Sequence, residues 1–404
     1  MKVALLGYGT VGSGVYEVIE ANKESIARRA GTAIELKYVL DLRKFPGDPI
    51  EKLIVNDFNT ILEDDEVEIV AEAMGGIHPA YEFAKATLES GKSYVTSNKE
   101  LVALYGGELL EIARENHVNF LFEASVGGGI PIIRPLNQSI TADEIYEITG
   151  ILNGTTNFIL TKMKNEGRTF EDVLKEAQAL GYAEKNPEAD VEGYDSCRKI
   201  AILASLAFGE HVSFEEIPTE GITKISKEDM LYAEQMNCEI KLLGTCQKQD
   251  HHIFARVAPM FISKNHPLAM VNDVFNAIFV KGNMVGDVMF YGKGAGKLPT
   301  ASAVVADIVD AAKHKGTNIM TLWNREKVEL KAKEDVRTSY FVRIKKEDDA
   351  LETKVKAVFG DVKTIEGLED EYAFVTEVMK ERHFSERIKD LGEMPIISKI
   401  RIQA

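Results

Sequence analysis

Residues 3–12 read VALLGYGTVG, an apolar run followed at once by the glycine pattern GxGxxG. The run Val3–Leu6 is typical of a short buried strand, and a helical pattern begins within the glycine-rich turn. Glycines at this spacing permit a tight turn, close approach of the backbone to a pyrophosphate and close helix–strand packing, and the N–H groups at the helix start can bind phosphate. The pattern alone is weak evidence for a dinucleotide site, because glycine-rich turns occur in many folds. The dinucleotide site predicted here contains Gly7, Gly9, Thr10, Val11 and Gly12.

Strands and helices alternate along the next hundred residues. The further strands predicted are Leu36–Leu42, Val67–Ala73, Ser93–Ser97 and Val118–Ala124. A helix between two of them has Pro79 near its first turn and Gly91 at its end. This alternation predicts an α/β fold with a doubly wound, Rossmann-type parallel sheet.

Ligands of such sheets bind at the C-terminal ends of the strands. The polar or small residues predicted at those ends are Gly75, Ser97, Lys99 and Glu123. Asp41 ends the second predicted strand, where an acid usually binds the adenosine ribose; it would repel a 2′-phosphate and so favours NAD. Arg43 and Lys44 follow it and could accept the phosphate of NADP, or could be solvated loop charges. The sequence therefore leaves NAD and NADP open.

The length, composition and net charge of the chain limit the classes of protein to which it can belong. A chain of 404 residues with 45% hydrophobic content predicts two or three folded domains, and the net charge of −16 argues against a nucleic-acid partner. No uncharged run approaches the ~20 residues that span a membrane, and the N-terminal apolar run is too short for a signal peptide. Three cysteines without CxxC spacing fit a reducing compartment without a zinc site. We expect a cytoplasmic protein that acts on a small molecule.

The alternation stops near Arg134, and a substrate domain of mixed strands and helices is expected beyond it. The stretch Ile200–Gly209 carries no charge, which predicts a helix buried on all faces, and Asp195 and Lys199 lie one turn apart at its start. One interpretation is a surface salt bridge worth a few tenths of a kcal/mol. The other is a partly desolvated lysine beside a carboxylate, which could protonate the alkoxide formed when hydride reaches a carbonyl.

Six segments carry a resemblance to the homoserine dehydrogenase family. They are GYGTVG (7–12), VTSNKELVA (95–103), FEASVGGGIPII (122–133), GILNGTTNFIL (150–160), LGYAEKNPEADVEGYDSCRKIAIL (180–203) and YGKGAGKLPTASAVV (291–305). The resemblance implies reversible, NAD- or NADP-dependent conversion of L-homoserine to L-aspartate 4-semialdehyde, a step of threonine and methionine biosynthesis. It also implies that the helix Thr300–Lys313 returns to the dinucleotide domain.

The resemblance assigns roles by position. Lys199 matches the proton-transfer lysine, and Lys99 matches a second lysine at the reacting end of substrate and nicotinamide. The positions expected to contact substrate are Glu184, Asp195, Asp190 and, in the polar turn, Thr155. The further positions expected to line the cofactor are Gly181, Glu184 and Gly296. The family also binds a structural sodium ion through main-chain oxygens, here those of Glu123, Val126, Gly128 and Ile130.

The last part of the chain predicts a separate module. Beyond a charged connector at 324–337, the elements expected are strand Ser339–Lys345, helix Asp349–Phe359, strands Val362–Glu366 and Tyr372–Met379, helix Ser385–Leu391 and strand Ile396–Ile402. This βαββαβ order is that of a ferredoxin-like unit and resembles the threonine-sensing ACT domain. Residues 345–349 read KKEDD, without the proline and glycine usual in the ligand-binding turn, so we do not expect threonine to bind in the usual manner.

The domains predicted are a dinucleotide-binding domain at 1–134 and 297–323, a substrate and dimerisation domain at 135–296, a linker at 324–337 and the ACT-like domain at 338–404. We expect a homodimer, or a tetramer through the ACT-like domain. Two alternatives remain. Another semialdehyde dehydrogenase would need a thiolate nucleophile, and Cys197 is the cysteine nearest the predicted site, on an apolar face. A non-enzymatic dinucleotide sensor would need a DNA-binding element, which the acidic sequence does not suggest.

Overall fold

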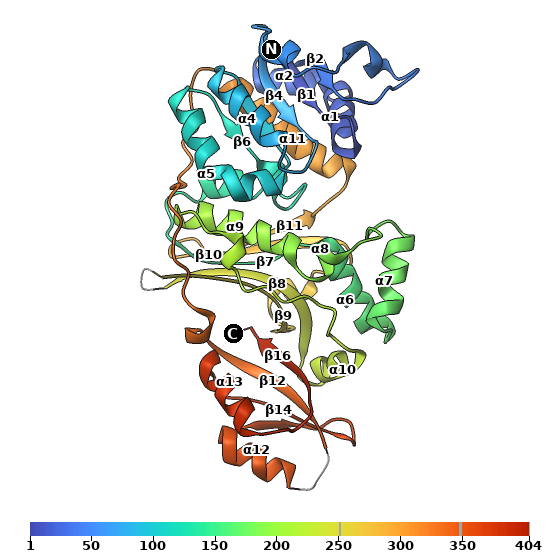
Figure 1. The fold of residues 1–404 in the computed structure, drawn as a ribbon, viewed down its shortest axis with the longest axis vertical. Coiled ribbons are helices and arrows are strands. Elements are labelled where there is room, and N and C mark those ends of the chain that lie inside the picture. The colour runs from blue at the N-terminus through green and yellow to red at the C-terminus, as the bar shows by residue number, and fades with distance from the viewer. Residues whose placement is uncertain (250–251, 347–349, 404) are drawn as a thin grey trace. The chain divides into compact units, whose positions relative to one another are not determined.

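The computed structural model describes residues 1–249, 252–346 and 350–403. The chain forms two compact units. The first contains Met1–Ile148, Ala201–Glu215 and Val280–Val328; the second contains Thr149–Ile200, Glu216–Phe279 and Glu329–Ala404. The four-part division expected from the sequence is finer than this and stays a prediction. Figure 1 labels most of the elements of both units.

The first unit is built on a six-stranded parallel sheet in the order β3-β2-β1-β4-β5-β6. Its strands are β1 Lys2–Leu6, β2 Glu35–Leu40, β3 Ile54–Val55, β4 Val67–Glu72, β5 Ser93–Thr96 and β6 Phe120–Leu121. The strand order reverses between β1 and β4, which is where a doubly wound sheet binds its dinucleotide. The predicted Rossmann-type fold is confirmed.

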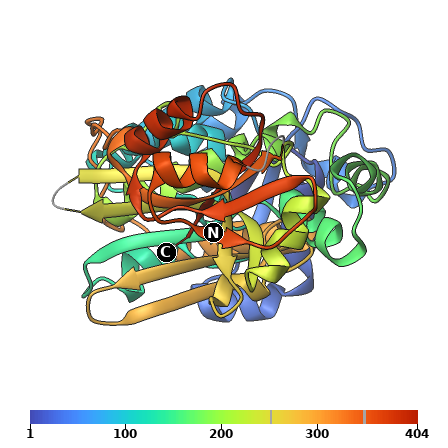
Figure 2. The same cartoon turned by 90° about the horizontal axis from the view of Figure 1, so that it is seen from below.

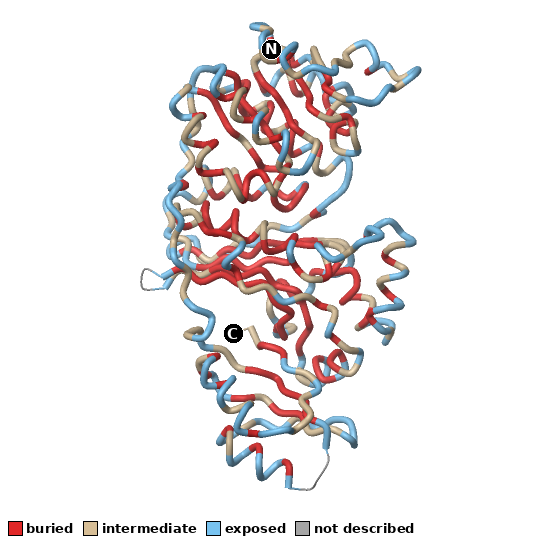
Figure 3. Tube along the Cα trace, viewed as in Figure 1, coloured by how far each residue is buried: buried red, intermediate tan, exposed pale blue. Residues whose placement is uncertain are grey.

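Helices cover both faces of this sheet. They are α1 Thr10–Ala21, α2 Lys23–Ala30, α3 Asn59–Leu62, α4 Ala80–Glu89, α5 Lys99–Glu115 and α11 Lys297–Lys313. Helices α1, α2 and α11 pack together, and α4 packs on α5. Buried residues run along the central strands in Figure 3, as parallel sheets require when both faces are covered. As the resemblance implied, α11 lies in the dinucleotide-binding unit, where a side chain at Gly14 would come within 2.8 Å of the Lys297 carbonyl oxygen.

Two strand predictions for this unit need correction. The strand expected at Val118–Ala124 is only Phe120–Leu121, because the chain turns into a 3-10 helix at Glu123–Ser125 and the Glu123 N–H donates to the Asp307 carboxylate at 2.8 Å. The strand expected at Leu36–Leu42 ends at Leu40, so that Asp41 lies just beyond it. Strand β3 was not predicted, because two residues give no readable alternation.

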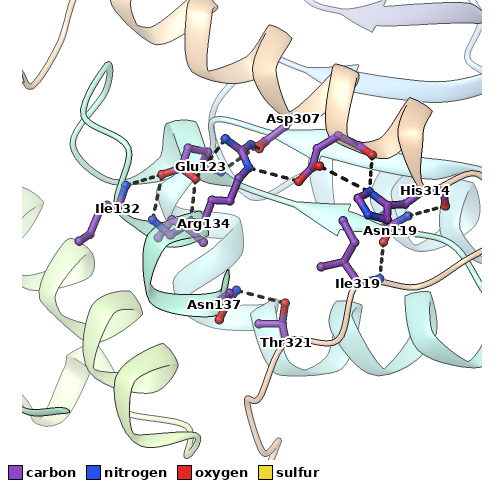
Figure 4. A network of polar contacts seen from close by, with 11 residues as sticks. Asn119, Glu123, Ile132, Arg134, Asn137, Asp307, His314, Ile319 and Thr321 are labelled. Carbon is purple, nitrogen blue, oxygen red and sulfur yellow. Dashed lines mark hydrogen bonds and ion pairs between the residues drawn. The ribbon is translucent and has the colours of Figure 1, made fainter. Parts of the chain in front are cut away.

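A buried polar cluster joins the end of β6 to α11 (Figure 4). The Glu123 carboxylate accepts the backbone N–H groups of residues 132, 133 and 134 at 2.5, 2.8 and 2.8 Å. The Arg134 guanidinium contacts Asp307 and lies 3.2 Å from the Asp310 carboxylate. Burial and the neighbouring Glu123 raise the pKa of Asp307. The cluster thus closes the loop 123–134 and attaches it to a helix from a distant part of the sequence.

Helix α5 carries two glycines in its interior for a packing reason. A side chain at Gly106 would come within 2.9 Å of the indole of Trp323, and Gly107 is almost as close to the same ring. Trp323 is the only tryptophan of the sequence. Its Nε1 donates to His211 Nδ1 at 3.3 Å, and the two rings stack. The chain after α11 is therefore packed onto α5 by close backbone approach.

The second unit contains the long antiparallel pair β8–β9 and most of the helical residues that precede it, whereas residues 201–208 and strand β11 belong to the first unit. The strands beyond the dinucleotide sheet are β7 Ile145–Ile151, β8 Cys238–Gln249, β9 His252–Ser263, β10 Phe275–Gly282 and β11 Gly286–Lys293. The helices are α6 Gly154–Glu166, α7 Phe170–Ala179, α8 Glu188–Val191, α9 Tyr194–Phe208 and α10 Lys227–Gln235. Helix α9 confirms the prediction of a buried helix, because every side chain from Ile200 to Leu206 is buried.

The C-terminal segment has the predicted βαββαβ order with one correction: the single strand expected at Tyr372–Met379 is divided into β14 and the two-residue β15, which pairs with β12. Its elements are β12 Arg337–Lys345, α12 Leu351–Phe359, β13 Lys363–Ile365, β14 Glu371–Val375, β15 Met379–Lys380, α13 Glu381–Asp390 and β16 Ile396–Ile402. The strand order β16-β12-β14-β13 is antiparallel and ferredoxin-like. Both helices pack on one face through residues such as Val342, Val355 and Phe384 (Figure 2). Helix α13 starts four residues earlier than expected, and residues 347–349 of the predicted atypical turn lie outside the described residues.

Replacing Arg134 by alanine tests the buried cluster. Because Arg134→Ala leaves buried carboxylates without their cation, we expect it to lower the free energy of unfolding by about 3–5 kcal/mol. Scanning calorimetry would then show a fall in Tm of about 6–20 °C. Arg114→Ala, on the exposed surface of α5, is the matched control and should change stability by less than ~1 kcal/mol. Equal Tm values for the two variants would contradict the role given to the cluster.

Candidate active site

The turn after β1 has the geometry of a phosphate-binding loop. Gly7 has a φ of +90°, and a side chain there would meet Met74 at 2.9 Å. A side chain at Gly12 would come within 2.0 Å of the Gly7 carbonyl oxygen, and Gly9 is the residue before α1. The first two residues of α1 are Thr10 and Val11. The turn itself therefore requires Gly7 and Gly12, whereas a side chain at Gly9 would meet nothing within 4 Å of its Cβ. The turn leaves the N-terminus of α1 open to an anion.

Asp41 and Arg43 form a compact pair just beyond β2. The Asp41 carboxylate accepts the Tyr8 N–H at 2.8 Å and two side-chain N–H groups of Arg43 at 2.9 and 2.7 Å. These bonds to Arg43 lower the pKa of Asp41 below its usual value. The Arg43 side chain is 60% exposed, so its guanidinium can still meet a ligand. The cavity beside the pair has a volume of about 590 Å³ and is lined by Gly7, Gly9, Leu40, Asp41, Leu42, Arg43, Asn56, Phe58, Ala73, Met74, Pro79 and Phe83.

The ends of β4 and β5 hold the other predicted residues of the first unit. Gly75 is exposed, with a φ of +83°, in the loop after β4. Ser97 follows β5, and Lys99, predicted at the end of that strand, is the first residue of α5. Asn98 caps this helix by accepting the N–H groups of residues 100 and 101 at 3.1 and 3.2 Å. Because these strands are parallel neighbours, the loops lie at the same edge of the sheet.

In the second unit, four polar side chains meet at the start of α9. Lys199 Nζ lies 2.6 Å from Asp195 Oδ2 and 2.8 Å from the Leu152 carbonyl oxygen. The Asn153 amide donates to Asp195 at 2.9 Å and to Asp190 at 2.7 Å. The side chains of Lys199 and Asp195 are only 12% and 9% exposed. This is not the solvated surface pair that one interpretation of the sequence allowed, but a largely buried one.

Asn153 is the residue that the sequence interpretation missed. It precedes α6, and its carboxamide oxygen accepts the Thr156 N–H at 2.9 Å as a helix cap. Its amide nitrogen is thereby directed to the two aspartates. An asparagine before a helical pattern is a readable cap signal, but its second role needs Asp190 and Asp195 to be close in space.

The loop after α7 brings Thr155 and Tyr182 together. Thr155 Oγ1 donates to the Tyr182 carbonyl oxygen at 2.6 Å. Gly181 has a φ of +75°, and Glu184 is exposed, with its carbonyl oxygen accepting from Gln178 at 3.1 Å. Thr155 therefore holds this loop, and the Glu184 carboxylate is accessible to a ligand.

The loop 123–130 and Gly296 lie in the first unit. Gly128 has a φ of +55°, and a side chain there would come within 2.4 Å of the Gly294 carbonyl oxygen. Gly296 precedes α11 with a φ of +127°. The predicted sodium ligands are the carbonyl oxygens of Glu123, Val126, Gly128 and Ile130. Among the described residues, and outside the helices and strands, none of these oxygens accepts a backbone hydrogen bond. The described residues also contain no cluster of three or more His, Cys, Asp or Glu side chains suited to a metal ion.

The cysteines argue against a thiolate mechanism. All three are buried and none forms a disulfide. Burial raises the pKa of the Cys197 thiol, which disfavours the nucleophilic thiolate. This observation removes the support for the alternative that requires a cysteine nucleophile.

A dinucleotide-binding sheet with a buried lysine–carboxylate pair in the second unit defines an NAD(P)-dependent oxidoreductase. Two family models match the chain: "Homoserine dehydrogenase, NAD binding domain" at residues 7–123 and "Homoserine dehydrogenase" at residues 131–309. The chain belongs to the homoserine dehydrogenase family.

Relatives and solved structures agree with this assignment. The homoserine dehydrogenase of Bacillus subtilis is 37% identical over 419 residues, which cover 99% of this chain and 97% of the relative. The crystal structure of a homoserine dehydrogenase from Thiobacillus denitrificans superposes with a TM-score of 0.91 at 36% identity, covering 100% of this chain and 98% of that chain. A hyperthermophilic archaeal homoserine dehydrogenase in complex with NADPH matches with a TM-score of 0.66 at 29% identity, over 77% of this chain and 97% of that one.

The contacts of Asn153 give a prediction. In Asn153→Asp the cap oxygen is kept, but a third carboxylate replaces the amide that donates to Asp190 and Asp195. Hydrogen bonds to charged groups contribute about 1.5–3 kcal/mol, so we expect kcat for homoserine oxidation to fall by about 10- to 100-fold. Asn157→Asp, on the same helix and bonded to Val271 and Phe275, is the control for a new buried charge. An Asn153→Asp enzyme as active as the wild type would show that the amide contacts are dispensable.

Proposed function

We propose that Lys199 is the general acid and base in the interconversion of L-homoserine and L-aspartate 4-semialdehyde. When bound, the dinucleotide supplies or accepts the hydride at the carbon that bears the reacting oxygen. The observation that carries the proposal is the position of Lys199 Nζ, which is held by Asp195 at 2.6 Å and by the Leu152 carbonyl at 2.8 Å. An ammonium has three N–H donors. Two of them are fixed by these contacts, and the third is assigned to the substrate oxygen.

In the direction of reduction, the carbonyl oxygen becomes an alkoxide that takes a proton from Lys199, and the product is the alcohol. In the direction of oxidation, Lys199 accepts the proton of the homoserine hydroxyl. Asp195 stabilises the charged lysine between the two events. The low exposure of the pair keeps bulk water from competing for the proton.

The remaining roles concern substrate and cofactor. The ammonium of the amino-acid end is assigned to Asp190 and to the exposed carboxylate of Glu184, and Thr155 supports the loop that carries Glu184. In the structure Asp195 is bonded to Lys199 and Asn153, so its proposed role shifts from holding substrate toward holding the lysine. Lys99 is proposed to assist at the reacting end. The cofactor is assigned to the glycine turn after β1, to Asp41 and Arg43, to Gly75, Ser97, Gly181 and Gly296.

Substitution of Lys199 tests the proposal. Lys199→Ala removes the proton donor, so kcat for homoserine oxidation should fall at least ~100-fold, while dinucleotide affinity measured by fluorescence stays unchanged. Lys199→Arg keeps the positive charge but holds its proton at neutral pH, so it should be nearly as impaired. Lys175→Ala, on the exposed face of α7, is the control. A near-wild-type kcat in Lys199→Ala would overturn the assignment, and Cys197→Ala should retain activity.

A preference for NADP is supported by the Asp41–Arg43 pair. The arginine neutralises the acid that would otherwise repel a 2′-phosphate, and its guanidinium remains exposed beside the cavity. Guanidinium groups are suited to bind phosphate in a bidentate manner.

Arg43→Ala should therefore reverse the preference. With Arg43 removed, the Asp41 charge repels the 2′-phosphate but can still bind a ribose hydroxyl. The ratio of kcat/KM for NADP to that for NAD should fall at least ~10-fold. Arg29→Ala, an exposed charge on α2, is the control. A ratio within twofold of the wild-type value would show that Arg43 does not read the phosphate.

Further proposals concern the ion and the assembly. A sodium ion would be held by the main-chain oxygens of Glu123, Val126, Gly128 and Ile130, in a loop that the Glu123 side chain closes. It would hold the backbone of the loop, and the proton and hydride transfers do not involve it. We further place the enzyme in threonine and methionine biosynthesis, as a homodimer or as a tetramer through an ACT-like C-terminal domain. The three buried thiols fit a reducing cytoplasm. No helix in the described ranges has the length and apolar character to cross a membrane.

A further inference from the structure

Glu72, the last residue of β4, is a buried carboxylate at the edge of the sheet where the dinucleotide is expected. It has 0% exposure in a strand that is otherwise mainly apolar. Its Oε1 accepts the backbone N–H groups of Met74 at 2.5 Å and Gly75 at 3.0 Å. Its Oε2 accepts the Thr96 hydroxyl at 2.6 Å. One carboxylate therefore binds the loop after β4 and the end of β5.

A second bridge joins the same two loops. The hydroxyl oxygen of Thr96 accepts the Asn98 N–H at 2.9 Å, which extends the contact from Glu72 into the loop after β5. The Asn98 amide donates to the Gly76 carbonyl oxygen, while its carboxamide oxygen caps α5. Asn98 immediately precedes Lys99. The loops 73–76 and 96–98 are thus connected at both ends by side chains that do not depend on a ligand.

Stability alone does not account for a carboxylate at this position. Burying a charge costs free energy that its hydrogen bonds must offset, and an apolar side chain often serves a buried strand as well. A carboxylate, however, is an acceptor with about four lone-pair sites, so one side chain can bind three donors from two loops. The arrangement gives two otherwise separate loops a common attachment.

We propose that Glu72 is a positioning residue for the dehydrogenase reaction. It joins the loops 73–76 and 96–98 into one rigid platform, which fixes Gly75 and Ser97 for the dinucleotide and Lys99 for the reacting end. This inference rests on the proposed roles of Gly75, Ser97 and Lys99. Glu72 itself is not assigned a contact with substrate or a proton-transfer step.

Two substitutions of Glu72 separate the effect of its contacts with the loop after β4 from the effect of its contact with Thr96. Glu72→Gln keeps an oxygen for the N–H groups of Met74 and Gly75 but replaces the acceptor of the Thr96 hydroxyl by an amide. Dinucleotide Kd should therefore stay within ~3-fold of the wild-type value, while kcat for homoserine oxidation falls ~10-fold. Glu72→Ala removes all three acceptors, so both kcat and dinucleotide affinity should fall at least ~10-fold. Kd is measured by fluorescence of bound NADPH or NADH, independently of turnover.

A double-mutant cycle tests the link between the loops directly. Thr96→Val removes the hydroxyl that joins Glu72 to Asn98 and should lower kcat much as Glu72→Gln does. If the two residues act as one unit, the double variant loses little more than either single variant. This cycle also decides the matter if Glu72→Ala does not fold. Additive losses would overturn the proposal.

Glu68→Gln is the matched control, because Glu68 lies on the same strand and the same face, four residues earlier and thus about 13 Å away at the opposite end. It should change neither kcat nor Kd. If Glu72 had only a structural role, Glu72→Ala would lower Tm, but the folded variant would keep the wild-type kcat and Kd. That result would refute the inference. If the wild type did not oxidise homoserine, the proposed function would fail, and the Kd values would still test the platform.

Discussion

The buried cluster of Glu123, Arg134 and Asp307 is the constraint on which the dinucleotide-binding unit depends. Asp307 is 184 residues from Glu123, and the chain between them includes most of the second unit. Helix α11 must therefore pack against a sheet whose strands all lie much earlier in the sequence. Hydrophobic contacts with α1 give it affinity for that face, but they are not directional. The cluster supplies the direction, because a buried carboxylate without Arg134 would be strongly unfavourable. The same cluster closes the loop 123–134, so one interaction places both the helix and the loop.

The sequence predicted those parts of the fold and site that local chemistry determines. The glycines of residues 7–12 were readable because the turn excludes any side chain at Gly7 and Gly12. The place of Lys99 beyond β5 was readable from the strand before it. Strand β6 was overestimated, because an apolar run does not reveal that Glu123 must turn back to accept three N–H groups. Asn153 and Glu72 were missed for a related reason. Their partners lie up to about forty residues away in sequence, and no periodicity marks them.

The pair Asp195–Lys199 shows how burial decides between two interpretations of one spacing. On a solvated helix, an ion pair at positions i and i+4 would contribute a few tenths of a kcal/mol to helix stability, and its residues could be substituted at little cost. Here the lysine is also bound to the Leu152 carbonyl, and the aspartate is bound to Asn153. The uncharged sequence after Lys199 predicted a buried helix, and that is the observation that made the surface interpretation weaker. The additional partners, Leu152 and Asn153, follow directly after β7, and only the three-dimensional structure could bring them to α9.

The C-terminal segment is attached to the second unit by more than its connector. Strand β16 pairs with β9 in parallel through Arg401 and Ile402, so the ferredoxin-like strands continue the sheet that contains β8 and β7. Arg343 of β12 is 2% exposed and lies between Asp229 of α10, at 2.7 Å, and Glu371. Removing one partner from such a buried pair is costly, so the segment cannot leave the sheet without exposing unpaired charge. Because β7 leads directly into Leu152 and Asn153, the sheet that contains the segment also contains the strand that ends next to the residues holding Lys199. A tethered module would need a separate docking event to affect that site, whereas this segment is already part of the scaffold that supports it.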